Sequence, residues 1–308
     1  MTVLEVIQRS TDFLVKKNVD SPRLQAELLL AHVLKLPRMQ LYLNFERVLS
    51  PAEEDSLRQL IKRRGQREPL QYILGSTSFC GLEIRVDRRV LIPRPETELL
   101  AEQGWTFLIE RLSPPASDSG YPCPSSHDEP EDSSAKGTVR ALDFGTGSGC
   151  LAIALAVNCP AANIVAVDVS AEALALAQEN ATHQGVAERV AFMLGNGLAT
   201  LSRDMDFDLL IANPPYIPSS EIDSLQPEVR DYDPRLALDG GPDGLEFYRH
   251  LASEGICLVK IGGKLMLELG DGQQASVTNI FQNENWIVER VVKDYSHQPR
   301  ILIARRPA

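Results

Sequence analysis

From residue 139 onward, short apolar segments alternate with longer segments of helical periodicity, and this alternation limits the possible folds more than any other feature. Apolar strands separated by helices indicate a mostly parallel sheet covered on both faces. The expected fold class is therefore α/β, with a Rossmann-like sheet of seven strands. We predict strands near 139–144, 163–168, 189–194, 207–212, 263–269, 285–292 and 299–305, and helices near 148–157, 171–184, 244–258 and 273–282.

The first 94 residues follow a different pattern. Residues 1–70 have helical periodicity, and Ser21-Pro22 predicts a helix start with a hydroxyl N-cap and proline at the first helical position. Ser50-Pro51-Ala52-Glu53 predicts a second start with a capping box. Residues 71–94 change to the period of strands, which predicts a β-hairpin turning near Asp87-Arg88. A helix from Pro95 to about Leu112 should follow.

Residues 113–138 consist mainly of Ser, Pro, Asp and Glu. Such a segment buries too little apolar surface to offset its ordering entropy, so we predict a disordered insertion. The expected organisation has three parts. They are an N-terminal helical domain over 1–70, a hairpin linker over 71–94, and a catalytic α/β domain over 95–308 that contains the insertion.

Composition excludes several classes of protein. The 308 residues carry a net charge of −11, so the broad positive field of a nonspecific nucleic-acid binder is absent and no direct nucleic-acid partner is expected. No apolar run is long enough to predict a membrane span, and the first residues do not resemble a secretory signal. The five cysteines form no C-x-x-C pair, so we expect no disulfide framework, no metal site, and a cytoplasmic location.

A glycine-rich turn joins the first predicted strand of the sheet to its helix: Gly145-Thr146-Gly147-Ser148-Gly149. Glycines allow positive φ and close approach to a ligand. The next strand ends in Asp168, where a carboxylate can accept hydrogen bonds from both hydroxyls of a ribose. The G-x-G-x-G spacing and the adjacent Asp143 favour a ligand with a cationic amino group over a pyrophosphate. S-adenosylmethionine fits, and a dinucleotide site or a purely structural turn are the alternatives.

Asn196-Gly197 follows the third predicted strand of the sheet. In class I methyltransferases this position contacts the amino group of adenine and is commonly aspartate. The side-chain carbonyl of Asn196 can accept the same hydrogen bond. We therefore include Asn196 and Gly197 in the predicted cofactor site.

The fourth predicted strand runs into Asn213-Pro214-Pro215-Tyr216, at the sheet edge where open α/β sheets bind ligands. A nitrogen conjugated to a carbonyl or an aromatic ring is a poor nucleophile because its lone pair is delocalised. The Asn213 side-chain carbonyl and the Pro214 backbone carbonyl can each accept one N–H hydrogen bond and favour a pyramidal nitrogen. Proline fixes φ and holds these carbonyls in place. Tyr216 can pack on the flat face of the substrate.

These residues predict methyl transfer to a planar nitrogen, with Asn213 and Pro214 as catalytic residues. Asn213 to Tyr216 form the predicted substrate site, and Asn213 also borders the cofactor site. The alternative is a proline-rich turn that only ends a strand. The tetrapeptide by itself leaves adenine, guanine and glutamine nitrogens open as targets.

The chain resembles the HemK/PrmC family of glutamine-N5 methyltransferases over nearly its whole length outside 113–138. The Pro-Arg-Pro-Glu-Thr-Glu and Ala-Leu-Asp-Gly-Gly segments are more specific to this family than the tetrapeptide. The segments that carry the resemblance are Pro69-Leu70-Gln71-Tyr72-Ile73-Leu74-Gly75, Leu91-Ile92-Pro93-Arg94-Pro95-Glu96-Thr97-Glu98, Asp143 to Gly149, Asn213 to Ile217, and Pro234-Arg235-Leu236-Ala237-Leu238-Asp239-Gly240-Gly241-Pro242-Asp243-Gly244-Leu245.

The resemblance implies a class I methyltransferase that uses S-adenosylmethionine to methylate the glutamine of a Gly-Gly-Gln motif in class-1 peptide chain release factors. It also implies that the N-terminal helical domain helps to dock this partner. The chain departs from the family pattern at the 113–138 insertion and at Gly197. We expect these departures to affect the affinity for the cofactor and not the type of reaction. A ribosomal-protein glutamine, an adenine or guanine nitrogen in nucleic acid, and a non-enzymatic cofactor-binding role remain alternatives. Arg94, Glu96 and Glu98 receive no role from the sequence.

Overall fold

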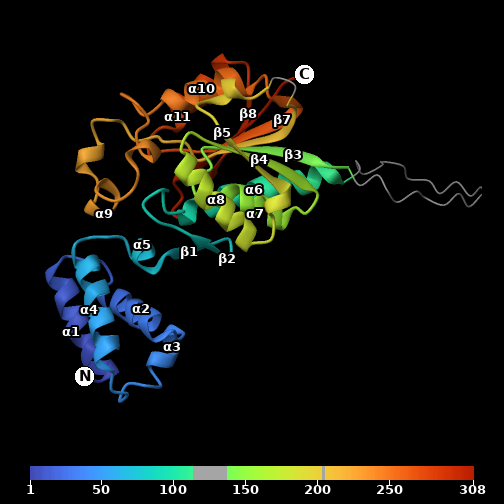
Figure 1. Cartoon of the computed structure of the whole chain (residues 1–308). Helices are drawn as coiled ribbons and strands as arrows, with labels where there is room; N and C mark the ends of the chain where they lie inside the picture. Colours follow the sequence, from blue (N-terminus) through green and yellow to red (C-terminus); the bar gives the residue numbers. More distant parts are fainter. Residues whose placement is uncertain (114–136, 203–204) are drawn as a thin grey trace, which may run out of the picture. The chain divides into compact units, whose positions relative to one another are not determined.

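The computed structural model describes residues 1–113, 137–202 and 205–308, so most of the predicted insertion lies outside the described residues. The chain forms two compact units (Figure 1). The first, which we call the helical unit, contains residues 1–77, 85–92 and 221–235. The second, the sheet unit, contains residues 78–84, 93–220 and 236–308. Nothing in the sequence pattern indicated that residues 221–235 join the N-terminal helices.

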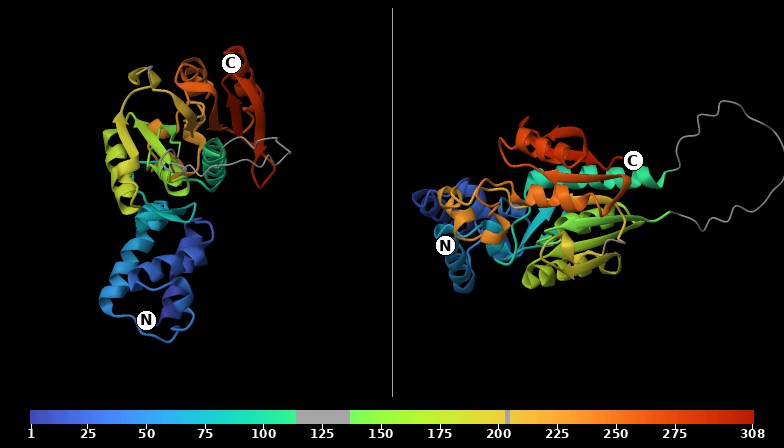
Figure 2. Two further views of the ribbon diagram at one scale, coloured as in Figure 1. Left: turned by 90° about the vertical axis from the view of Figure 1, so that its right-hand side faces the viewer. Right: turned by 90° about the horizontal axis from the view of Figure 1, so that it is seen from above.

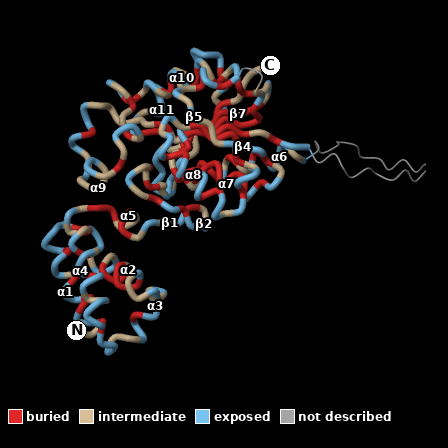
Figure 3. The backbone as a smooth tube through the Cα atoms, viewed as in Figure 1, coloured by how far each residue is buried: buried red, intermediate tan, exposed pale blue. Residues whose placement is uncertain are grey.

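The helical unit is built on amphipathic helices that share one apolar core. Its buried members include Val6, Leu14, Leu29, Leu57 and Ile61, and Figure 3 shows buried residues on the helix sides that meet. Helices Val3–Lys16 and Pro51–Gly65 each follow a hydroxyl residue at the N-cap and have glutamate at their third position. Both start with a complete capping box. The helices are α1 Val3–Lys16, α2 Pro22–Leu34, α3 Arg38–Leu41, α4 Pro51–Gly65, α5 Leu70–Leu74 and α9 Pro227–Arg230, with a 3₁₀ turn at Ile222–Ser224.

Two local predictions are wrong. Pro22 does begin α2, but Ser21 has a left-handed backbone, with φ 45° and ψ 51°, and its hydroxyl makes no capping bond. The hairpin, formed by β1 Ser76–Phe79 and β2 Leu82–Arg85, turns at Cys80-Gly81 and not near Asp87-Arg88. Both turn residues have positive φ, which a two-residue hairpin turn of the type I′ class requires, and Gly81 supplies it without strain.

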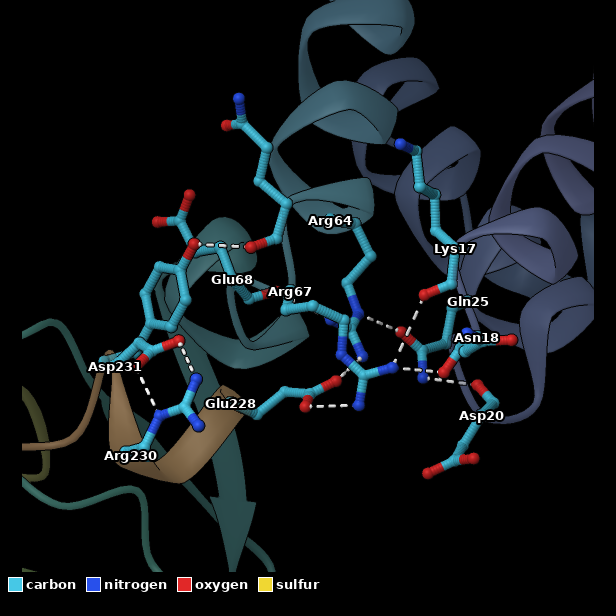
Figure 4. Close-up of polar contacts among 12 residues, drawn as sticks. Lys17, Asn18, Asp20, Gln25, Arg64, Arg67, Glu68, Glu228, Arg230 and Asp231 are labelled. Atoms are coloured by element: carbon cyan, nitrogen blue, oxygen red, sulfur yellow. Dashed lines mark hydrogen bonds and ion pairs between the residues drawn. The ribbon is translucent and has the colours of Figure 1, made fainter. Parts of the chain in front are cut away.

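Within the helical unit, polar contacts bind the distant segment 221–235 to residues of the N-terminal part of the chain. Glu228 accepts hydrogen bonds from the guanidinium groups of Arg64 at 2.8 Å and Arg67 at 2.6 Å, as Figure 4 shows. The Tyr72 hydroxyl donates to the Asp233 carboxylate at 2.7 Å. Because Arg64 is buried, this pairing satisfies a charge that would otherwise be costly.

The sheet unit confirms the predicted α/β fold. Its seven strands have the order β5-β4-β3-β6-β7-β9-β8. The first five in this order are parallel, whereas β9 runs antiparallel to both of its neighbours. The strands are β3 Val139–Phe144, β4 Ala162–Asp168, β5 Val190–Leu194, β6 Phe207–Ala212, β7 Val259–Glu268, β8 Ile287–Lys293 and β9 Pro299–Arg305.

Helices cover both faces of this sheet, with α6, α7 and α8 on one side and α10 and α11 on the other (Figures 1 and 2). The central strands β3 and β6 are buried almost throughout, as expected for parallel strands between two helical layers. Among the described helices, none has both the length and the apolar character needed to cross a membrane. The helices are α6 Pro95–Leu112, α7 Cys150–Asn158, α8 Ala171–His183, α10 Glu246–Gly255 and α11 Gln274–Asn283, and 3₁₀ turns lie at Ala187–Arg189, Leu198–Thr200 and Arg235–Ala237.

Candidate active site

The sheet register places the glycine loop beside the tetrapeptide. In the parallel pair of β3 and β6, Phe144 lies opposite Ala212. Gly145 and Asn213 are the next residues of these two strands, and neighbouring strands in a sheet lie about 5 Å apart. The structure therefore brings the predicted cofactor loop and the predicted catalytic motif together at the carboxyl ends of adjacent central strands.

The glycine loop has the backbone geometry that its sequence predicts. Gly145, Gly147 and Gly149 all have positive φ, at 71°, 53° and 80°. A Cβ atom added to Gly145 or Gly147 would meet nothing within 4 Å, so one side of the loop is open. On the other side, Asn180 donates to the Ser148 carbonyl at 2.9 Å and fixes the loop to α8. The loop thus presents its backbone to a ligand from one direction.

Asp143, the last residue but one of β3, organises the start of the loop. Its Oδ2 atom accepts hydrogen bonds from the Thr146 hydroxyl at 2.6 Å and from the Ala152 N–H at 3.1 Å. Its Oδ1 atom is buried and has no hydrogen-bond partner in the described part of the chain. Burial raises the pKa of Asp143 to about 7. A buried acceptor without a partner is costly, and a cationic donor group from a ligand would offset that cost.

Asp168 ends β4 and lies directly beside the loop. Its Oδ2 accepts from the Gly147 N–H and its Oδ1 from the Ser170 N–H, each at 2.9 Å. Each carboxylate oxygen keeps further lone-pair capacity, so both can still accept from a ligand. The side chain therefore connects the two loops that follow β3 and β4. This link between the loops was not predicted from the sequence.

Asn196 and Gly197 follow β5, the next strand outward from β4. Asn196 is exposed, and Gly197 has φ 89° with nothing within 4 Å of an added Cβ. The predicted cofactor residues, Asn213 after β6 included, therefore lie at the carboxyl ends of four strands that are neighbours in the sheet. This arrangement suits a ligand with an amino group, a ribose and a base laid across that edge.

The Asn213 side chain takes part in a buried hydrogen-bond chain. Its Nδ2 atom donates to the Thr97 hydroxyl oxygen at 3.1 Å, and the Thr97 hydroxyl donates to Glu268 Oε2 at 2.6 Å. Thr97 lies in the first turn of α6, and Glu268 ends β7. Thr97 and Glu268 are 1% and 2% exposed, so these bonds are protected from water. The amino end of the Asn213 amide faces into the protein, and its carbonyl Oδ1 is the opposite end.

Tyr216, the last residue of the tetrapeptide, is also held by hydrogen bonds. The Tyr216 hydroxyl donates to Glu268 Oε1 at 3.4 Å, and its backbone carbonyl accepts from Gln273 Nε2 at 2.9 Å. Tyr216 also packs against the apolar core beneath it. Its predicted contact with a substrate remains a prediction.

The Ala-Leu-Asp-Gly-Gly segment lies against the backbone of the tetrapeptide. The Ile217 N–H donates to the Leu238 carbonyl at 3.0 Å, and the Gly240 N–H donates to the Ile217 carbonyl at 2.8 Å. A Cβ on Gly240 would lie 2.8 Å from the Tyr216 Cα, and one on Gly244 would lie 2.4 Å from the Tyr216 carbonyl oxygen. These glycines therefore allow a close approach of two backbones that no larger residue permits.

Thr97, Glu268, Gln273, Gly240 and Gly244 were not identified as site residues from the sequence. Thr97 and the two glycines lie inside segments that carry the family resemblance, which was the available signal. Glu268 gave a weaker signal, as a lone carboxylate ending an apolar strand. Of the three residues left without a role, Glu98 accepts a hydrogen bond from the Cys80 N–H at 2.9 Å, which ties α6 to the hairpin turn.

Comparison with known proteins identifies two matching families and similar relatives. Residues 5–75 match the family described as the PrmC N-terminal domain, and residues 132–226 match the methyltransferase small domain. A release factor glutamine methyltransferase from Chlorobaculum tepidum is 42% identical over 302 residues, covering 97% of this chain and 95% of the relative. Another from Geobacter sulfurreducens is 42% identical over 280 residues, covering 91% of this chain and 88% of the relative.

A solved structure supports the fold. The hMettl16 catalytic domain, in complex with MAT2A 3′UTR hairpin 6, matches with a TM-score of 0.54 at 15% identity. The match covers 81% of this chain and 82% of that one. At this identity the likeness concerns the class I methyltransferase fold and not the substrate.

Proposed function

The chain belongs to the release factor glutamine methyltransferase family, and from this we propose that it methylates the glutamine of the Gly-Gly-Gln motif in class-1 peptide chain release factors. The methyl group goes from S-adenosylmethionine to the side-chain amide nitrogen, N5. The observation that carries the chemistry is the register of β3 and β6, which puts Gly145 and Asn213 side by side. Translation termination takes place in the cytoplasm, where we expect the protein to act.

We assign the cofactor site to the loops that follow β3, β4 and β5. Asp168 accepts from the ribose hydroxyls, and Asp143 Oδ1, which has no partner among the described residues, fits the cationic amino group. Gly145 to Gly149 present an open backbone face, and Asn196 and Gly197 border the adenine. When bound, S-adenosylmethionine supplies a methyl group on a positively charged sulfur that departs as a neutral thioether.

The substrate amide is held by two carbonyl oxygens, Asn213 Oδ1 and the backbone oxygen of Pro214. Each accepts one N–H of the glutamine side chain, and together they favour the pyramidal nitrogen whose lone pair attacks. The rigid prolines hold both acceptors before the reaction, so little reorganisation is needed. Alignment of the nitrogen with the methyl carbon then accounts for most of the rate. The methylated nitrogen loses its proton after transfer, so no strong base is required.

The direct test is methylation of full-length release factor by the purified protein with labelled S-adenosylmethionine. We expect one labelled glutamine in the wild-type substrate and none in a release factor whose Gly-Gly-Gln has been changed to Gly-Gly-Ala. Ribosomal proteins, ribosomal RNA and DNA serve as parallel substrates. Labelling of any of these with release factor untouched would refute the proposal and identify the alternative.

A further inference from the structure

A carboxamide side chain can present either its oxygen or its nitrogen to a ligand, because the two ends are similar in shape. The proposed reaction works with only one of them. If Asn213 turned its NH₂ group toward the substrate amide, two donors would face each other and the nitrogen would lose an acceptor. Something in the protein must therefore fix which end of Asn213 faces outward.

The hydrogen-bond chain behind Asn213 has a direction. Ionised Glu268 can only accept, so the Thr97 hydroxyl must give its single hydrogen to Glu268 Oε2, at 2.6 Å. The Thr97 oxygen is then left as an acceptor, and the Asn213 atom that lies 3.1 Å from it must be the nitrogen. The orientation of the Asn213 amide thus follows from the charge of a carboxylate two hydrogen bonds away.

We propose that Thr97 and Glu268 are positioning residues that hold the Asn213 carboxamide with Oδ1 toward the substrate amide. The proposal rests on the function proposed above and explains why a buried threonine and a buried carboxylate lie behind the tetrapeptide. Neither residue touches the reacting atoms. Both act through Asn213, from elements far from it in the sequence: Thr97 is 116 residues away from it and 171 residues from Glu268.

Other groups hold Glu268 in place for this role. The Tyr216 hydroxyl donates to its second oxygen, and burial raises the pKa of Tyr216, so this hydroxyl keeps its proton. The Tyr248 hydroxyl on α10 donates to the Glu268 backbone carbonyl at 3.0 Å. Two charged groups also act on the carboxylate: Arg300 on β9 favours its ionised form, and Glu96 on α6 opposes it.

The direction of the chain depends on the charge of Glu268. Burial raises its pKa to about 7 from an ordinary value of 4.5. A protonated Glu268 can donate to the Thr97 oxygen, and the Thr97 hydrogen is then free to point at Asn213. The Thr97 hydrogen can bond only to the oxygen of the Asn213 amide. The carboxamide therefore flips, and its NH₂ group faces the substrate. The turnover number should therefore fall as the pH decreases through about 7.

The first experiment replaces the hydroxyl of Thr97 while keeping its shape. In Thr97→Val we expect kcat for release factor methylation to fall by about 10- to 100-fold, the range for misplacement of a reacting group. Thr97→Ser restores the hydroxyl and should stay within about threefold of the wild type. Thr106→Val, at an exposed position of the same helix, is the matched control and should be unchanged. The donor Kd and the Tm should be similar in all four proteins.

This experiment separates the inference from the proposed function. If the wild type fails to label release factor, the proposed function is wrong. If the wild type labels it and Thr97→Val retains the kcat of Thr97→Ser, the positioning role is wrong. A loss in Thr97→Val that serine does not rescue would also overturn it, because the hydroxyl would not be the cause.

The second experiment uses Glu268→Gln, which stays neutral at every pH. Its carbonyl can accept from Thr97 while its NH₂ group faces Tyr216, so the chain keeps its direction. We expect the acid limb of kcat near pH 7 to disappear in this variant at saturating donor. Saturation matters because Asp143 also has a pKa of about 7 and belongs to the proposed cofactor site. An unchanged acid limb in Glu268→Gln would rule out the proposed control.

A third readout does not depend on turnover. In protein labelled at asparagine nitrogens, the side-chain NH₂ of Asn213 should give two distinct proton signals, one of them shifted by its bond to Thr97. Thr97→Val should remove that shift, and Thr97→Ser should keep it. Identical Asn213 signals in the two variants would contradict the hydrogen-bond chain.

Discussion

The glycine loop and the tetrapeptide lie on neighbouring strands, but they are held in different ways. The loop is supported by residues close to it in the sequence, such as Asp143, Thr146 and Asp168. The tetrapeptide is supported in part from α6 and β7, which lie much farther away in the sequence: Thr97 is 116 residues from Asn213, and Glu268 is 52 residues from Tyr216. A ligand-binding turn can thus be encoded locally, whereas the orientation of a reacting group depends on the assembled fold.

Because the two regions are held differently, substitutions in them should change different properties of the enzyme. Changes near the glycine loop should act on cofactor affinity, since the loop and its supports form one local structure. Changes around the tetrapeptide should act on turnover, with cofactor affinity preserved. Three substitutions test this separation, beginning with the one expected to have the largest effect, and a fourth tests the ion pairs that hold segment 221–235.

Asn213→Ala removes one of the two proposed acceptors for the substrate amide. We expect kcat to fall by about 1000-fold, the upper range for loss of a preorganised hydrogen-bonding group. The donor Kd, measured by calorimetry, should change by less than about threefold. Retained turnover would remove Asn213 from the mechanism, and a lost donor affinity would mean that the two regions are not separable.

Gly240→Ala forces a Cβ atom to within 2.8 Å of the Tyr216 Cα and 2.9 Å of the Pro215 carbonyl oxygen. Because both are backbone atoms, the tetrapeptide must shift, and a shift of about 1 Å costs about 100-fold in rate. We expect that loss in kcat, with donor affinity kept. Gly137→Ala is the control, since its added Cβ lies within 4 Å of no atom in the described residues. Equal activity of the two variants would show that the close approach is unimportant.

Asp168→Ala should show the opposite pattern. It removes an acceptor for the ribose and the bond that orders Gly147, and hydrogen bonds to charged groups contribute about 1.5–3 kcal/mol. The donor Kd should therefore rise by about 10- to 100-fold. At saturating donor, kcat should remain within about threefold of the wild type. A large fall in kcat under saturation would break the proposed separation.

Glu228→Ala should have the smallest effect on chemistry and a clear effect on stability. Burial tends to raise the pKa of Glu228, but the bonds from Arg64 and Arg67 outweigh it and hold the pKa below its ordinary 4.5. This stabilisation is complete above pH 4.5 and is lost as the pH falls through the lowered folded-state pKa. We expect a loss of about 2 kcal/mol at pH 7 for segment 221–235.

Hydrogen exchange of the amides in 221–235 measures that loss. Glu221→Gln, at an exposed carboxylate of the same segment, should exchange like the wild type. The difference between Glu228→Ala and the wild type should shrink as the pH falls below 4.5. If the difference persisted undiminished at low pH, the ion pair would not be its source.

The same contrast explains what the sequence could predict. The sheet and the glycine loop were predicted correctly because period, glycine spacing and a strand-ending carboxylate are all local signals. Asn213 was assigned a catalytic role because it precedes rigid prolines at the end of a central strand, and that role stays a prediction. Thr97 and Glu268 were missed because their contacts with Asn213 depend on β7 lying beside β6 and on α6 packing against both strands, and no local pattern records these neighbours.

Two local predictions were wrong for a related reason. A period-two pattern continues past β2 through Val90 and Ile92, so it suggested a later turn, while the positive φ of Cys80 has no residue-type signature. Ser21 has the right chemistry for a cap but the wrong backbone conformation. In both cases the backbone conformation of the residue, and not its side-chain type, determined the local structure.

The discontinuity of the helical unit limits how the chain can be divided. A fragment that starts after residue 93 would still carry residues 221–235, but it would lack Arg64, Arg67 and Tyr72, which bind that segment. Conversely, an isolated N-terminal fragment would keep two arginines without their carboxylate. Exchanging the helical unit between relatives should therefore fail unless residues 221–235 are exchanged together with the N-terminal helices.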